Sequence, residues 1–69
     1  METLGLSLKL IRIRRGILQR EIAARAGLSP SRLSEIENDW RTPRADELKR
    51  IREALGISSL TQNAQGAEG

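Results

Sequence analysis

The stretch from Gln19 to Asn38, QREIAARAGLSPSRLSEIEN, contains the signals that decide the fold. In its first part, apolar residues recur at a helical spacing and Gly27 ends the segment, which predicts a short helix over residues 19–26. A hydroxyl N-cap at Ser29 and a proline at the first helical position follow directly. These signals predict a second helix over residues 29–38, with two apolar residues three positions apart on its buried face.

Helical spacing also dominates on both sides of this stretch, and strand-like alternation is nearly absent. Before it, residues 3–15 carry two apolar stripes and end at Gly16. After it, a loop leads to a helix that begins near Ala45, has two carboxylates in its first turn and ends at Gly56. We therefore expect an all-α globule of four to five helices. The expected core residues are Leu8, Ile11, Ile22, Leu33, Ile36, Leu48 and Ile51.

Length and composition bound the class of protein. Sixty-nine residues allow one domain, which we place at residues 1–61, whereas residues 62–69 offer nothing large to bury and are expected to form a flexible tail. Because the chain has no Cys and no His, it lacks the usual thiol nucleophile, proton shuttle and metal ligands, so we expect no enzyme and no cofactor. We see no membrane span and no export signal, and therefore expect a cytoplasmic protein.

Positive charge is concentrated in the N-terminal half of the chain. Twelve Lys and Arg against nine Asp and Glu give a net charge of +3. Residues 9–25 contain six cationic residues and only one acidic residue, Glu21. Most of the cations are arginines, whose planar guanidinium group binds phosphate through two N–H groups. A polyanion is a reasonable partner on this ground, and basic residues that merely solvate the helices explain the same modest excess.

Two short helices joined by a tight turn at residues 27–29 form a helix-turn-helix arrangement. Over residues 8–57 the chain resembles the phage-repressor and Cro-like helix-turn-helix family, also called the XRE family. The residues that carry the resemblance are Leu8, Ile11, Arg12, Gly16, Gln19, Ile22, Ala23, Ala26, Gly27, Leu28, Ser29, Leu33, Ser34, Ile36, Glu37, Pro43, Ala54, Leu55 and Gly56. The resemblance implies a lambda-repressor-like fold and a sequence-specific DNA-binding transcriptional regulator.

The resemblance makes residues 29–38 the recognition helix, whose N-terminal part enters the major groove of double-stranded DNA. Polar side chains there can meet base edges, since an arginine can bond guanine twice and a carboxylate can accept from cytosine. The expected base contacts are Ser31, Arg32, Ser34 and Glu35. The alternative is that all four belong to a solvated face. Pro30 replaces a polar residue often found in the family, so one base contact is expected to be lost.

Phosphate contacts are implied in the same way. Gln19 begins the supporting helix, where the family grips a phosphate with the side chain and backbone amides, and helix N-termini attract anions in general. The expected phosphate contacts are Gln19, Arg20, Asn38, Arg41 and Arg44. A simple exposed capping role is the alternative for Gln19. Asp39 stands where glycine is common, and its charge opposes close approach of a phosphate there.

Comparison with the family draws attention to an ion pair and to one departure from the usual pattern. Arg12 and Glu37 match a largely buried ion pair that links the first helix to the recognition helix in the family, so we expect Arg12 to be structural. Trp40 lies in a loop where the family usually has a small or basic residue. It either folds back on Pro43 and the core edge, which we favour, or contacts a ribose or a second subunit.

The function that follows is a repressor that binds an inverted-repeat operator as a homodimer, because one recognition helix reads too few base pairs to find a site in a genome. The alternative is a protein-binding module or an antitoxin-type partner that uses the second apolar stripe of the first helix. That stripe consists of Leu6, Leu10 and Ile13. It is expected to pack either against Leu60 or against another chain.

Overall fold

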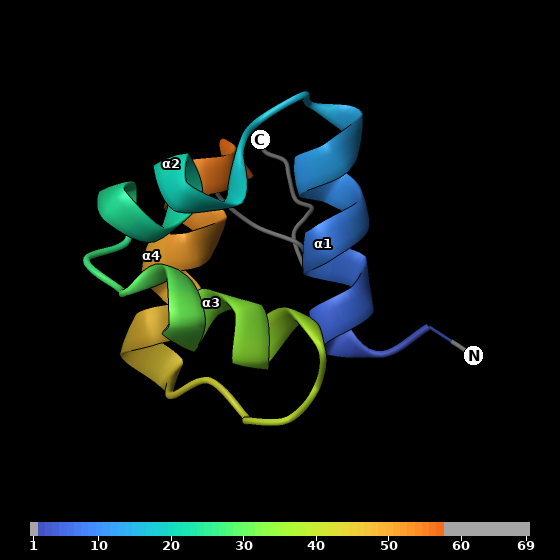
Figure 1. Ribbon diagram of the computed structural model, residues 1–69, viewed down its shortest axis with the longest axis vertical. Coiled ribbons are helices and arrows are strands. Elements are labelled where there is room, and N and C mark those ends of the chain that lie inside the picture. The colour runs from blue at the N-terminus through green and yellow to red at the C-terminus, as the bar shows by residue number, and fades with distance from the viewer. Residues whose placement is uncertain (1, 58–69) are drawn as a thin grey trace, which may run out of the picture.

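Four helices account for most of residues 2–57, the part of the chain that the computed structural model describes (Figure 1). The helices are α1 (Leu4–Arg14), α2 (Gln19–Arg25), α3 (Pro30–Glu37) and α4 (Ala45–Leu55). Helices α1 and α2 each pack against both α3 and α4. No strand occurs within residues 2–57, and the expected all-α fold is confirmed. The expected tail and Leu60 lie outside the described residues.

The helices begin and end within two residues of the expected positions because the local signals form as expected. Ser29 Oγ accepts a hydrogen bond of 3.0 Å from the N–H of Arg32, and Pro30 is the first residue of α3. Gly16 and Gly27 have φ angles of 67° and 70°, so each supplies the left-handed residue that follows a helix. The start of the recognition helix is thus set by residues adjacent in sequence.

The core lies where the four helices meet. Its fully buried apolar residues are Leu8, Ile22, Ala23, Ala26, Leu33, Ile36, Ile51 and Leu55. The expected core residues Ile11 and Leu48 are only partly buried and pack against this cluster. Leu4, which shares a helical stripe with Leu8 in the sequence, is 40% exposed because it lies at the first turn of α1, beyond the edge of the cluster.

The N-terminal turn of α1 rests on the C-terminal end of α3. The carboxylate of Asp39 accepts hydrogen bonds from the hydroxyl of Thr3 and, at 3.2 Å, from the N–H of Gly5. A Cβ atom on Gly5 would overlap the backbone oxygen of Ile36 and would lie 2.9 Å from that of Glu37. The close approach of the two helices therefore requires glycine at position 5, and it places the positive end of α1 on the carbonyl groups that end α3.

Candidate nucleic-acid interface

The α2–α3 turn, residues 26–29, is stabilised by one hydrogen bond back to α2 and one from α4. Within the turn, the N–H of Leu28 donates to the backbone oxygen of Ala23 at 2.8 Å. From α4, the Nε atom of Arg50 donates to the backbone oxygen of Ala26 at 2.8 Å. These bonds satisfy carbonyl groups at the end of α2 and attach the beginning of the turn to α4.

One face of α3 is directed away from the core. Ser31 is exposed, Ser34 and Glu35 are half-buried, and Asn38 is exposed at the end of the helix. The spacing of three, four and seven residues puts these side chains on one face, opposite the buried Leu33. Three of the four expected base contacts thus lie together on a polar surface.

Arg32, the fourth expected base contact, points sideways to α4. Its Nε and Nη2 atoms lie 3.1 and 2.8 Å from the two carboxylate oxygens of Glu47. Only 26% of the Arg32 side chain is exposed, so it is half-buried, as Ser34 and Glu35 are, rather than free in solvent. The physical reason is a buried acceptor across the helix interface. Its base contact stays a prediction, and reaching a base would require Arg32 to leave Glu47.

Glu47 is only 3% exposed although it carries a charge. Besides Arg32, it accepts a 2.9 Å hydrogen bond from the N–H of Arg44 at the start of α4. The bond from Arg32, followed by that from Arg44, lowers the pKa of Glu47 from 4.5 to about 2 and outweighs the opposing effect of burial. The same pair raises the pKa of Arg32.

The Glu47 pair predicts a specific loss of stability in acid. Because the pKa of Glu47 is lower in the folded than in the unfolded chain, its contribution is complete above pH 4.5 and is lost as the pH falls toward 2. Urea denaturation followed by circular dichroism across this range should show a steeper loss for the wild type than for Glu47→Gln. Glu53→Gln, at an exposed position of the same helix, should keep the wild-type slope. Equal slopes for the wild type and Glu47→Gln would contradict the assignment.

Glu37 joins three helices. It accepts bonds of 2.8 and 3.2 Å from Arg12 of α1 and of 3.0 Å from the amide nitrogen of Gln19 on α2. Arg12 also donates to the backbone oxygen of Ile17 at 2.9 Å. The structure therefore brings Arg12 and Glu37 together as expected, with side chains that are 12% and 2% exposed, respectively. It also adds Gln19 to the pair, a contact that the sequence did not predict.

The start of α2 does not use Gln19 as its cap. The N–H of Leu18 donates to the carboxylate of Glu21 at 3.1 Å, so the exposed capping role considered for Gln19 falls to Glu21. Gln19 is half-buried and has one amide N–H engaged by Glu37. The phosphate contact expected of Gln19 stays a prediction. The position of the Gln19 side chain depends on Glu37, which is also the partner of Arg12.

The remaining expected phosphate contacts lie at the exposed ends of three helices. Arg20 is in the first turn of α2 and has no ion pair within residues 2–57. Asn38 follows α3 and donates to the backbone oxygen of Ser34 at 2.8 Å. Arg44 precedes α4 and lies 3.4 Å from Asp46. Arg41, in the loop between α3 and α4, bonds Glu35 at 2.7 Å.

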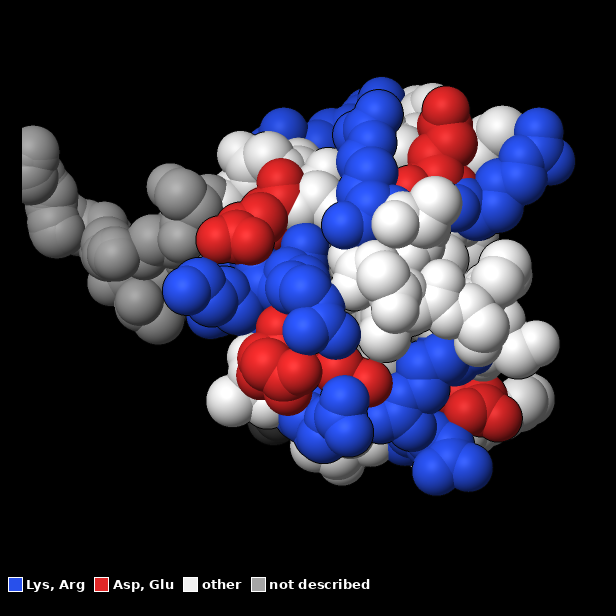
Figure 2. Space-filling model, turned by 90° about the vertical axis from the view of Figure 1, so that its left-hand side faces the viewer, with Lys and Arg blue, Asp and Glu red and all other residues white. Residues whose placement is uncertain are grey.

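Basic and acidic side chains alternate on part of the surface. Figure 2 shows this mixture from the side of α2 and α4, with no continuous basic patch on that face. Arg50, for example, lies 3.0 Å from Asp46 one turn earlier. Net charge is therefore a weaker indication of DNA binding than the polar face of α3 and the positions of individual arginines.

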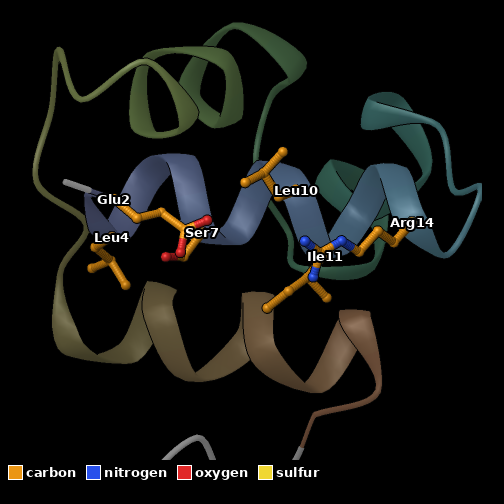
Figure 3. A pocket seen from close by; sticks show the side chains of 6 residues that line it. All are labelled: Glu2, Leu4, Ser7, Leu10, Ile11 and Arg14. Atoms are coloured by element: carbon orange, nitrogen blue, oxygen red, sulfur yellow. The ribbon is translucent and has the colours of Figure 1, made fainter.

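Helix α1 leaves several apolar side chains in solvent. Leu4, Leu6 and Ile13 are exposed, and a shallow groove of about 310 Å³ runs along the helix (Figure 3). The residues that line it are Glu2, Leu4, Ser7, Leu10, Ile11 and Arg14. Within the second stripe, Leu10 is half-buried while Leu6 and Ile13 are not. The expected packing of this stripe against Leu60 involves a residue outside the described part of the chain.

Trp40 does not fold back on the core. Its side chain is 76% exposed, so the alternative favoured from the sequence, contact with Pro43 and the core edge, was wrong. The physical reason is the backbone after α3: Asp39 has a φ angle of 62°, and the N–H of Trp40 donates to the backbone oxygen of Glu35 at 2.9 Å. This tight turn directs the indole outward.

A helix-turn-helix family model matches residues 8–61, which is more than three quarters of the chain. A search of curated proteins finds no significant match. None of the helices in residues 2–57 is long and apolar enough to cross a membrane. The matched region contains α2, α3, their turn and both buried ion pairs. The chain therefore belongs to the phage-repressor and Cro-like (XRE-type) helix-turn-helix family of DNA-binding transcription regulators.

Proposed function

We propose that the protein is a repressor that binds an inverted-repeat operator as a homodimer, with α3 of each copy in the major groove. The polar face of α3 carries this proposal, because the major groove admits an α-helix and the polar side chains on this face can bond base edges. One α3 contacts few base pairs, so two copies supply the specificity that a genome demands. Repression itself needs only occupancy of the operator.

Base reading is assigned first to Ser31, Ser34 and Glu35. One carboxylate oxygen of Glu35 is bonded by Arg41, and the other can accept from the amino group of cytosine. Arg32 is assigned a positioning role in the free protein because it ties α3 to the buried Glu47. To contact guanine, Arg32 would have to break its bonds to Glu47 and form new ones to the base.

Backbone contacts are assigned to residues that flank the polar face. Gln19 and Arg20 lie in the first turn of α2, whose N–H groups favour a phosphate. Asn38 follows α3 directly and lies at the same end of this helix as Gln19, whose amide bonds Glu37. Arg41 and Arg44 lie in the loop that leads to α4.

Selection of bound duplexes from a random pool tests this proposal. We expect an inverted repeat whose half-site centres are about one helical turn, roughly 34 Å, apart. In a parallel selection, Glu35→Gln should change the preferred base at one position of each half-site. Arg44→Ala, the matched control, should keep the consensus and weaken binding to all sequences about equally.

The same selection has outcomes that contradict separate parts of the proposal. A single unsymmetrical site would overturn the homodimer, and an unchanged consensus with Glu35→Gln would remove Glu35 from the base contacts. The second candidate function, a protein-binding module that does not read DNA, is favoured by the exposed Leu4, Leu6 and Ile13 of α1. It predicts that no duplex is enriched.

A further inference from the structure

We propose that Trp40 contacts the DNA backbone, with its indole packed against the sugar groups of the strand that borders α3. The inference rests on the proposed function and adds a non-ionic contact to it. Trp40 is the only aromatic residue of the chain, so this contact is also directly observable by fluorescence.

Backbone hydrogen bonds fix the turn that carries the exposed indole of Trp40. The N–H groups of Trp40 and Arg41 both donate to the backbone oxygen of Glu35, at 2.9 and 3.3 Å. The preceding residue, Asp39, is anchored through its carboxylate to Thr3 and Gly5 of α1. A large apolar side chain on such a fixed turn, 76% exposed, is available to a partner without reordering of the chain.

The neighbours of Trp40 indicate which partner fits. The turn begins at Asn38, where the polar face of α3 ends, so Trp40 lies within two residues of that face. Arg41 and Arg44 are exposed on the same loop. A DNA strand offers apolar sugar faces between anionic phosphates, which suits an indole beside two guanidinium groups. Each guanidinium group is already paired in the free protein, Arg41 with Glu35 at 2.7 Å and Arg44 with Asp46 at 3.4 Å, so a phosphate would be bound in addition to these carboxylates or in their place.

Fluorescence of Trp40 tests the contact on the intact chain. The probe is an unlabelled mixed-sequence duplex of about 20 base pairs at about 50 mM salt, where backbone contacts bind without regard to sequence. We expect the emission to shift to shorter wavelength and acrylamide quenching to fall as duplex is added. Anisotropy of the same duplex carrying fluorescein reports binding independently of Trp40.

The two readouts separate the ways in which the inference can fail. Unchanged Trp40 emission while anisotropy shows binding overturns the contact and leaves the proposed function standing. A shift that depends on protein concentration without DNA assigns Trp40 to a second copy and also overturns it. Absence of binding in both readouts overturns the proposed function together with the inference.

Variants test the non-ionic character of the contact. Trp40→Ala should lower affinity about tenfold with an unchanged dependence of log K on log salt, whereas Arg44→Ala should reduce that slope by about 1. Trp40→Phe should restore most of the affinity, because an aromatic ring can still pack on a sugar. The thermal midpoint of Trp40→Ala should match the wild type, since the side chain is outside the core. Full affinity for Trp40→Ala would contradict the inference.

Discussion

Glu37→Ala is expected to lower the free energy of unfolding by about 3 to 5 kcal/mol, which is the usual effect of removing one partner of a buried ion pair. The substitution leaves the guanidinium of Arg12, 12% exposed, without its carboxylate. It also removes the acceptor of the Gln19 amide. A domain of this length has a total stability of roughly 3 to 10 kcal/mol, so the loss is a large fraction of the whole and should lower the urea midpoint steeply.

Urea denaturation monitored by circular dichroism measures this effect. Glu53→Ala removes an exposed carboxylate with no ion pair within residues 2–57 and should change the stability by less than about 0.5 kcal/mol. Glu37→Gln keeps one acceptor oxygen in nearly the same volume and should fall between the two. A loss below about 1 kcal/mol for Glu37→Ala would show that Arg12 reaches solvent at little cost and that Glu37 does not hold the three helices together.

Local signals in the sequence predicted the helices and the α2–α3 turn because their causes lie within a few residues. Ser29 bonds the N–H of Arg32, three residues on, and Gly27 is left-handed directly after α2. The Arg12 and Glu37 pair spans 25 residues, and it could be expected only because the chain resembles a family in which that pair is present.

Contacts across helix interfaces explain what could not be predicted. Glu47 was interpreted only as a favourable charge in the first turn of α4, and its bond to Arg32 depends on the packing of α4 against the helix-turn-helix unit. Trp40 is exposed because of a left-handed residue at position 39, where the sequence has Asp rather than glycine. The polar face of α3 was predictable from helical spacing, whereas the partners that restrain Arg32, Glu35 and Gln19 were not.

Gly5→Ala is expected to destabilise the fold by about 2 to 3 kcal/mol, the upper part of the range for added atoms in a packed site. Helix propensity alone predicts the opposite sign, because alanine stabilises a helix interior by roughly 0.5 to 1 kcal/mol relative to glycine. The steric effect should prevail since the added Cβ meets backbone oxygens of Ile36 and Glu37, which cannot rotate away as a side chain would. The first turn of α1 would then leave α3.

The matched control is Ser7→Ala in the same helix. Serine already carries a Cβ atom, so Ser7→Ala adds no atom to the packed structure, and the better helix former should leave stability equal or slightly higher. Amide exchange should distinguish a local from a global effect: in Gly5→Ala the first turn of α1 should lose protection before the core residues Leu8 and Leu33 do. Stabilisation by Gly5→Ala would mean that the two helices separate readily and that propensity decides at this position.

A double-mutant cycle with Asp39→Ala examines whether Gly5 and Asp39 act as one junction. Asp39→Ala removes the acceptor for Thr3 and Gly5 and places a less tolerant residue at a φ angle of 62°, so by itself it should destabilise the domain by about 1 to 2 kcal/mol. If Gly5→Ala already lifts α1 from α3, the second substitution can remove those bonds only once. The loss for the double variant should therefore be smaller than the two single losses together by about 1 kcal/mol. Full additivity would show that the carboxylate of Asp39 and the space at Gly5 stabilise the α1–α3 contact independently.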